Sequence, residues 1–201
     1  MANHKIAKGI KKIEHRYKMI TTEDYLKDFV DVDKFIEYCK SCPNYGARWS
    51  CPPYSYDIME YYWKKYKYLH LFAFKMYLDD SVAETDMTEE QINDLVMSIR
   101  HQNYILVSEW IKNVEKTNPD STAVDGGHCA KCKRCMRLDN KPCRYGNEYR
   151  PGIDAIGGNL VKTAEDIFGI KILWIKNGVV PDYFLFMVGL LSDDEKIKFK
   201  F

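Results

Sequence analysis

The sequence has almost no excess of charge of either sign. Its 30 Lys and Arg residues are balanced by 29 Asp and Glu residues, which gives a formal net charge of +1 at pH 7. Binding to duplex DNA or to an anionic membrane through surface charge requires a clear cationic excess. We therefore expect no nucleic-acid partner and no membrane partner, although a local basic patch is still open around Lys131, Lys133, Arg134 and Arg137.

Long apolar runs are also missing. The most apolar stretch, Tyr183 to Leu191, is far shorter than the roughly 20 apolar residues that a membrane-spanning helix requires. Pro181 and Asp193 bound it, and we interpret it as a buried strand. The segment from Met1 to Lys8 lacks the apolar run of a secretory signal. These features predict a soluble, cytoplasmic protein.

Several motifs of common enzyme classes are absent as well. The sequence has no phosphate-binding P-loop, and its Gly157-Gly158 pair does not extend to Gly-x-Gly-x-x-Gly. Neither Gly-x-Ser-x-Gly nor His-Glu-x-x-His occurs. A nucleotide site and these two hydrolase classes therefore have no support, and no catalytic residue can be assigned.

The seven cysteines have a distribution that neither disulfide bonding nor packing explains. An odd number cannot all pair within one chain, and the cytosol keeps thiols reduced. Packing would place single cysteines on the apolar faces of helices and strands. Instead they form two groups, which are Cys39, Cys42 and Cys51 in the loop 39–54, and Cys129, Cys132, Cys135 and Cys143 in the loop 128–145. This distribution favours metal binding, with all seven as candidate ligands.

The spacing within the groups indicates iron–sulfur ligation. Two residues between cysteines allow a tight turn to direct both sulfurs at one metal centre. The run Cys129-x2-Cys132-x2-Cys135 has the spacing with which bacterial ferredoxins wrap a [4Fe–4S] cluster. Gly126 and Gly127, just before it, permit backbone conformations that other residues avoid.

Seven thiolates divide most simply into four and three. In this assignment the second group holds one [4Fe–4S] cluster, and the first group holds another in which one iron lacks a cysteine ligand. That iron could bind a substrate, a small anion or His128. Three alternatives stay open: ligands exchanged between the clusters, a single four-cysteine cluster with three bystander thiols, and a structural zinc ion on Cys39, Cys42, Cys129 and Cys132.

Hydrophobic periodicity predicts an alternation of helices and strands. We expect helices over 5–20, 31–38, 55–66, 88–115 (with a Thr88–Gln91 capping box) and 153–168, and strands over 69–78, 121–124, 170–175 and 183–191. This order predicts a single domain over 1–201 of the α/β or α+β class, in which a small mixed sheet with flanking helices carries the two cysteine-rich loops.

The motifs around the cysteines resemble a family of predicted metal-binding proteins of unknown function, found mainly in anaerobic bacteria and archaea. The matching pieces are Cys42-Pro-Asn-Tyr-Gly, Trp49-Ser-Cys51-Pro-Pro-Tyr, Gly127-His-Cys129-x2-Cys132-x2-Cys135, Pro142-Cys143-Arg144 and Arg150-Pro-Gly-Ile-Asp-Ala-Ile-Gly. The usual form of the last motif has Glu where this chain has Asp154. The resemblance implies metal binding, an iron–sulfur centre and an anaerobic setting, but no reaction.

Three other residues are candidates for the site because they adjoin the cysteines. His128 could be a ligand or a proton relay, or an ordinary loop histidine. Arg48 could bind an anionic substrate near an open iron, or be solvated. We expect Trp49 to pack against the loops and shield the metal from water.

Three functions follow from these features. The first is electron transfer between redox partner proteins. The second, ranked close behind, is an iron–sulfur enzyme that uses an open iron on the group Cys39, Cys42 and Cys51 to act on a small molecule, with sulfur-containing molecules among the candidates. The third is a binding module stabilised by zinc.

Overall fold

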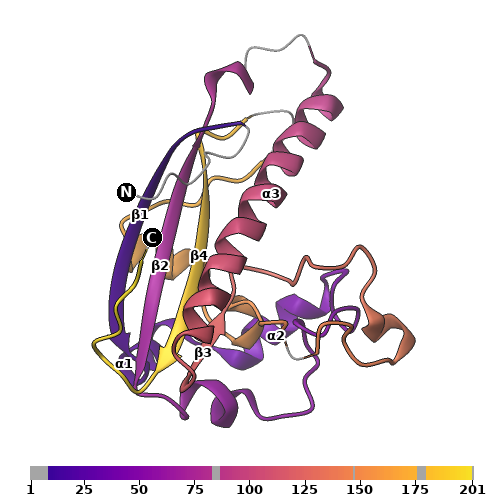
Figure 1. Ribbon diagram of the computed structural model, residues 1–201. Coiled ribbons are helices and arrows are strands. Elements are labelled where there is room, and N and C mark those ends of the chain that lie inside the picture. Colours follow the sequence, from indigo (N-terminus) through magenta and orange to yellow (C-terminus); the bar gives the residue numbers. More distant parts are fainter. Residues whose placement is uncertain (1–8, 83–86, 147, 176–179, 201) are drawn as a thin grey trace.

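The computed structural model describes residues 9–82, 87–146, 148–175 and 180–200. Figure 1 shows a sheet of long strands with one long helix lying along it and the irregular loops gathered beside the lower half of that helix. The strands are β1 (Ile10–Thr21), β2 (Tyr68–Leu78), β3 (Ser121–Val124) and β4 (Tyr183–Ser192), and the α-helices are α1 (Thr22–Phe29), α2 (Val32–Lys40), α3 (Glu89–Lys116) and α4 (Leu160–Lys162). Short 3-10 or π turns are η1 (Met59–Trp63), η2 (Asp80–Val82), η3 (Met136–Asp139), η4 (Asp154–Ile156) and η5 (Thr163–Ile167).

The four strands form one sheet in the order β1-β2-β4-β3. Each pairing between neighbouring strands is antiparallel. The α+β alternative of the sequence prediction is therefore confirmed, with the difference that these strands form an antiparallel sheet and not a mixed one. Strand β4, the most apolar segment of the sequence, lies inside the sheet between β2 and β3, as its composition predicts.

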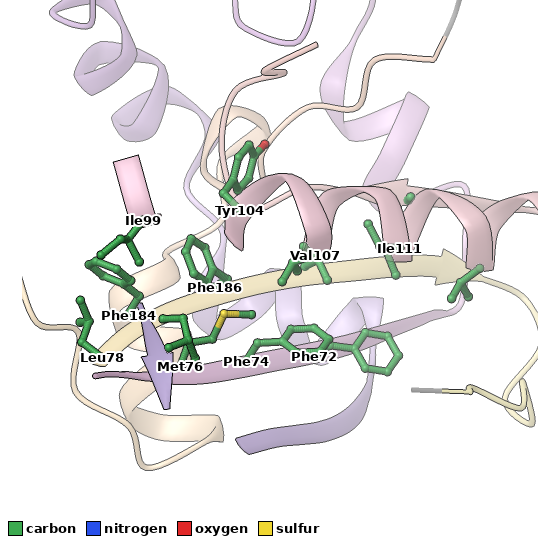
Figure 2. Close-up of a cluster of buried hydrophobic side chains, with 14 of the residues drawn as sticks. Phe72, Phe74, Met76, Leu78, Ile99, Tyr104, Val107, Ile111, Phe184 and Phe186 are labelled. Carbon is green, nitrogen blue, oxygen red and sulfur yellow. The ribbon is translucent and has the colours of Figure 1, made fainter. Parts of the chain in front are cut away.

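Both faces of the sheet are covered, because the central strands are apolar on both sides. Along β2, Phe72, Phe74 and Met76 join the cluster under α3, whereas Leu69 and Leu71 join the cluster on the opposite face. Figure 2 shows the first cluster, where side chains of β2 and β4 meet those of α3. The second cluster is covered by α1, η1 and the segment after residue 152.

Helix α3 begins where the sequence predicts. The Thr88 hydroxyl accepts a hydrogen bond from the Gln91 N–H, and the Gln91 side chain accepts one from the Thr88 N–H. This capping box satisfies two backbone donors that the first helical turn leaves unpaired. Among the described helices, none is long and apolar enough to cross a lipid bilayer.

The helix predicted over 5–20 is wrong where the structure describes it. Residues 10–21 form strand β1, and residues 5–8 lie outside the described residues. The spacing of Ile10, Ile13 and Ile20 fits a helix, but β1 is an edge strand paired with β2 along its length. Pairing with an apolar strand outweighs the local helical pattern. The sequence pattern did not predict the helix α1 that follows.

Two other predictions need correction in the second half of the chain. The helix expected over 153–168 is interrupted between η4 and α4, where Gly157 adopts a φ of +96°, and α4 continues directly into η5. The strand expected over 170–175 has no regular structure. Its apolar residues Ile170 and Ile172 instead pack on the second cluster without joining the sheet. The helix expected over 55–66 is shorter, at Met59–Trp63.

Candidate metal centre

Helix α2 positions the first cysteine group. Cys39 lies in the last turn of α2, and the Cys42 N–H donates to the Cys39 carbonyl at 2.9 Å, which turns the chain so that the two residues stay close. The Cys51 N–H donates to the Arg48 carbonyl at 3.0 Å. Cys51 is buried, Cys39 is half-buried and Cys42 is exposed.

The second cysteine group lies on a loop that is anchored to the first loop and to α3. The Cys129 N–H donates to the Ser50 hydroxyl at 2.8 Å, and the Tyr104 hydroxyl of α3 donates to the His128 carbonyl at 2.8 Å. The Leu138 N–H donates to the Cys135 carbonyl, which begins the turn η3. All four cysteines of this group are partly buried.

Two arginines join the loops reciprocally. Arg48 of the first loop donates to the Cys129 carbonyl at 3.1 Å and to the Cys132 carbonyl at 3.3 Å. Arg137 of the second loop donates to the Arg48 carbonyl at 2.8 Å and also to the carbonyls of Cys51 and Pro53. Figure 1 shows the two loops together beside the lower half of α3. Segments about 90 residues apart thus share one set of hydrogen bonds.

The three cysteines of the first group line a cavity of about 230 Å³. Besides Cys39, Cys42 and Cys51, its walls include Arg100 from α3, Gly126, Gly127 and His128 from the approach to the second loop, and Asp154 from η4. The cavity therefore combines three thiols with a carboxylate, an imidazole and a guanidinium.

The four cysteines of the second group line a separate and smaller cavity of about 20 Å³. Trp49, Tyr145 and Tyr149 form part of its wall. The Trp49 indole donates to the Lys141 carbonyl at 3.1 Å, and the Arg137 guanidinium lies 5.2 Å from the Trp49 ring centroid. The structure thus separates the cysteines into the same groups of three and four that the sequence suggests.

The two cavities share a wall. Ser50 lines both of them, and it directly precedes Cys51 of the first group while accepting from the Cys129 N–H of the second. His128 lines the first cavity and the adjoining residue Cys129 lines the second. Because consecutive Cα atoms are about 3.8 Å apart, the two cavities are immediate neighbours.

Residues 25–191 match the profile of a family described as "Predicted metal-binding protein (DUF2284)". The chain belongs to this family. All seven cysteines lie within the matched DUF2284 region, as do His128 and Asp154. The comparison with curated proteins gave no match, and the comparison with solved structures gave none either. The expected family is therefore confirmed, and the description of the family agrees with the general expectation of metal binding.

In the first cavity of the DUF2284 chain, burial favours the protonated form of two cysteine thiols. Burial raises the pKa of the Cys39 thiol to about 11, and the nearby Asp154 carboxylate raises it further. Burial raises the pKa of the Cys51 thiol to about 11 as well, although a hydrogen bond with Ser50 opposes the rise. Thiols in such a setting lose their protons when a metal supplies positive charge, so metal binding and proton release are linked.

One oxygen atom tests whether this cavity fits a metal group. Oδ1 of Asp154 is buried and has no hydrogen-bond partner among the described residues. A Cβ atom placed on Gly152 would lie only 2.3 Å from this oxygen, so glycine at 152 leaves the space that the carboxylate occupies. A buried polar atom without a partner is costly, and a coordinated cation would remove that cost. The donor set of the first cavity therefore fits a metal group.

The zinc alternative requires thiols that the structure keeps apart. Cys39 and Cys42 line the first cavity, whereas Cys129 and Cys132 line the second. Within the described ranges, no three His, Cys, Asp or Glu side chains gather around the position of a single metal ion. A zinc ion would draw its sulfurs to about 2.3 Å from one point, whereas each cysteine on a cubane binds a different iron.

The three neighbouring candidates have distinct positions. His128 faces the first cavity, and burial lowers the pKa of its imidazole, with Arg48, His101 and Arg100 adding to the shift. Arg48 is half-buried and lines the second cavity, where the carbonyls of Cys129 and Cys132 accept its hydrogen bonds. Trp49 packs against the second group, as the sequence predicts.

Sequence reasoning missed the roles of Ser50, Arg137 and Asp154. Ser50 and Arg137 act through hydrogen bonds between distant loops, for which a single sequence carries no signal. Asp154 stands out in the sequence only as a departure from the usual motif. The available signal was its position two residues after Gly152, in the segment that follows the cysteines.

Proposed function

We propose that this protein binds two [4Fe–4S] clusters and transfers single electrons between partner proteins. The cysteines that would hold them are Cys129, Cys132, Cys135 and Cys143 for one, and Cys39, Cys42 and Cys51 for the other. When bound, such clusters supply a one-electron redox couple. The electron would come from a reduced donor protein and leave to an oxidised acceptor protein.

The observation that carries this proposal is the shared wall of the two cavities. An electron carrier benefits from adjacent redox groups, and Ser50 touches both cavities. Backbone N–H groups, hydrogen bonds to sulfur and burial set the reduction potential of such groups. The aromatic wall of the second cavity would exclude water from the four-cysteine group.

The first test is the composition of the chain purified without oxygen. We expect about eight irons and about eight acid-labile sulfides per chain, which is the content of two [4Fe–4S] clusters. Cys135→Ser and Cys51→Ser form a matched pair, because each removes one ligand from a different group. Each should lose iron from its own group and keep about four irons in the other group. Zinc without sulfide would contradict the proposal.

The second candidate is an iron–sulfur enzyme, and one observation favours it. The first cavity, at about 230 Å³, is much larger than the second and contains Arg100, His128 and Asp154 besides its three thiols. A small anionic molecule could approach a three-cysteine cluster there. This candidate predicts that small sulfur-containing molecules perturb the spin-resonance spectrum of the reduced protein. Under the first candidate the spectrum stays unchanged.

A further inference from the structure

The three-cysteine group has a missing fourth ligand, and two side chains in its cavity could supply it. These are His128, which the sequence suggested, and Asp154. The two differ in their present contacts. His128 Nδ1 lies 3.4 Å from the Asn44 side-chain amide, whereas Oδ1 of Asp154 is buried without any hydrogen-bond partner among the described residues.

The backbone fixes Asp154 from two sides. On one side the Ile153 N–H donates to the Asp125 carbonyl at 2.9 Å, and the Asp125 N–H donates to the Pro151 carbonyl at 2.7 Å. These two bonds attach the segment just before Asp154 to the end of β3. The carboxylate is therefore held on a rigid support and not on a free loop.

On the other side, η4 packs against the start of α2. The Asp31 N–H donates to the Gly157 carbonyl at 2.9 Å. A Cβ atom on Gly157 would lie 2.8 Å from the Cα of Val32, so the approach is as close as the backbones permit. Helix α2 ends with Cys39 in its last turn. The start of α2 contacts the segment of Asp154 and the end of α2 carries Cys39, so this helix fixes both residues relative to the first cavity.

We propose that Asp154 is the fourth protein ligand of the group formed by Cys39, Cys42 and Cys51, binding through its unpartnered carboxylate oxygen. This inference rests on the proposed function, because it assigns a ligand to one of the two clusters. Carboxylate oxygen is a harder ligand than thiolate, so the cluster would keep one distinct iron. The cationic side chain of Arg100, in the same cavity, offsets part of the negative charge.

The test compares three variants with the natural chain, all purified without oxygen. Asp154→Ala removes the carboxylate, Asp154→Cys replaces it with thiolate, and His128→Ala is the matched control from the same cavity. We expect about eight irons per chain in the natural protein, in Asp154→Cys and in His128→Ala, and about seven in Asp154→Ala, which should also show the spin-resonance signal of a three-iron cluster. Asp154→Cys should differ from the natural protein in its reduced spectrum.

Some outcomes would overturn the assignment while leaving the two clusters in place. These are an Asp154→Ala protein with the iron content and spectrum of the natural chain, or an iron loss seen in His128→Ala instead. A natural chain without acid-labile sulfide would overturn the proposed function itself. If Asp154→Ala does not fold, as judged by circular dichroism, Asp154→Asn takes its place with the same expected iron loss, since it keeps the side-chain size.

Discussion

The guanidinium group of Arg137 donates a hydrogen bond to the backbone carbonyl of Arg48, and Arg48 in turn donates to the carbonyls of Cys129 and Cys132. Each loop thereby supplies an arginine that binds the backbone of the other. None of these three hydrogen bonds uses a cysteine sulfur, so the two cysteine groups are held side by side while every thiol stays available as a ligand.

Replacing Arg137 should loosen the junction between the loops. Arg137→Lys keeps the charge but cannot reproduce a planar fork of donors that reaches three carbonyls. We expect a loss of about 1–3 kcal/mol in the free energy of unfolding and faster loss of iron to a chelator. Denaturant titration and the rate of iron release measure the two effects. Arg134→Lys, whose partner Asp139 lies within the same loop, is the control. Equal effects in both variants would contradict the role given to Arg137.

The ion pair between Glu115 and Arg150 should stabilise the chain just after the second loop. Arg150 Nε lies 2.7 Å from Glu115 Oε1, which also accepts the Ala123 N–H at 2.9 Å. Glu115→Gln removes the charge and keeps the shape, so we expect the free energy of unfolding to fall by about 1–3 kcal/mol. Thermal unfolding of the two proteins measures this loss. The exposed pair of Lys64 and Glu60 is the comparison, and Glu60→Gln should cost much less.

Gly157 should tolerate a side chain less well than Gly169. Both glycines have positive φ, +96° and +63°, so alanine at either position is strained. At Gly157 the new Cβ would also lie 2.8 Å from the Val32 backbone, whereas at Gly169 nothing lies within 4 Å. We expect Gly169→Ala to lower the free energy of unfolding by about 1 kcal/mol and Gly157→Ala to lower it clearly more. Denaturant midpoints of the two proteins compare the costs directly, and equal midpoints would contradict the close approach.

Stability should fall on acidification because of His70. Burial lowers the pKa of this imidazole below its ordinary value of 6.5. Its ring nitrogens contact the Tyr17 hydroxyl at 2.8 Å and the Asp194 carbonyl at 2.9 Å, a pairing that suits the neutral ring. The unfolded chain binds the proton more readily than the folded chain, so stability is complete above about pH 7 and decreases as the pH falls through 6.5.

A variant isolates the contribution of His70 from that of other titrating groups. His70→Gln cannot titrate, so its free energy of unfolding should change less than that of the natural chain between about pH 7.5 and 5.5. Denaturant titrations at the two pH values provide the comparison. The same pH dependence in both proteins would show that His70 is not responsible.

Local patterns were sufficient for part of the fold. The capping box at Thr88 and Gln91 identified the start of α3, and the apolar run after Asp182 identified β4. The sequence pattern of segment 10–20 predicts a helix although the segment is an edge strand. An edge strand is partly exposed, so polar residues interrupt the alternation of apolar and polar side chains that marks a strand. The remaining isoleucines then fall at helical spacing. What decides its structure is β2, a segment far along the chain.

The candidate site divides in the same way. The grouping of the cysteines was visible because ligand spacing is a local property of the sequence. The wall shared at Ser50 and the nearness of Asp154 to Cys39 were not, because both depend on how η4 and the second loop pack against α2 and the first loop. Whether the seven cysteines are metal ligands stays a prediction that iron and sulfide determination will test.

Neither hydrophobic cluster contains a cysteine. The apolar interior is built from the sheet, α3 and the helical turns, and the thiols lie outside it, Cys39 in the last turn of α2 and the other six in loops. We therefore expect the polypeptide to fold before it binds metal. Metal could then be inserted into the folded protein, removed and inserted again without unfolding of the chain.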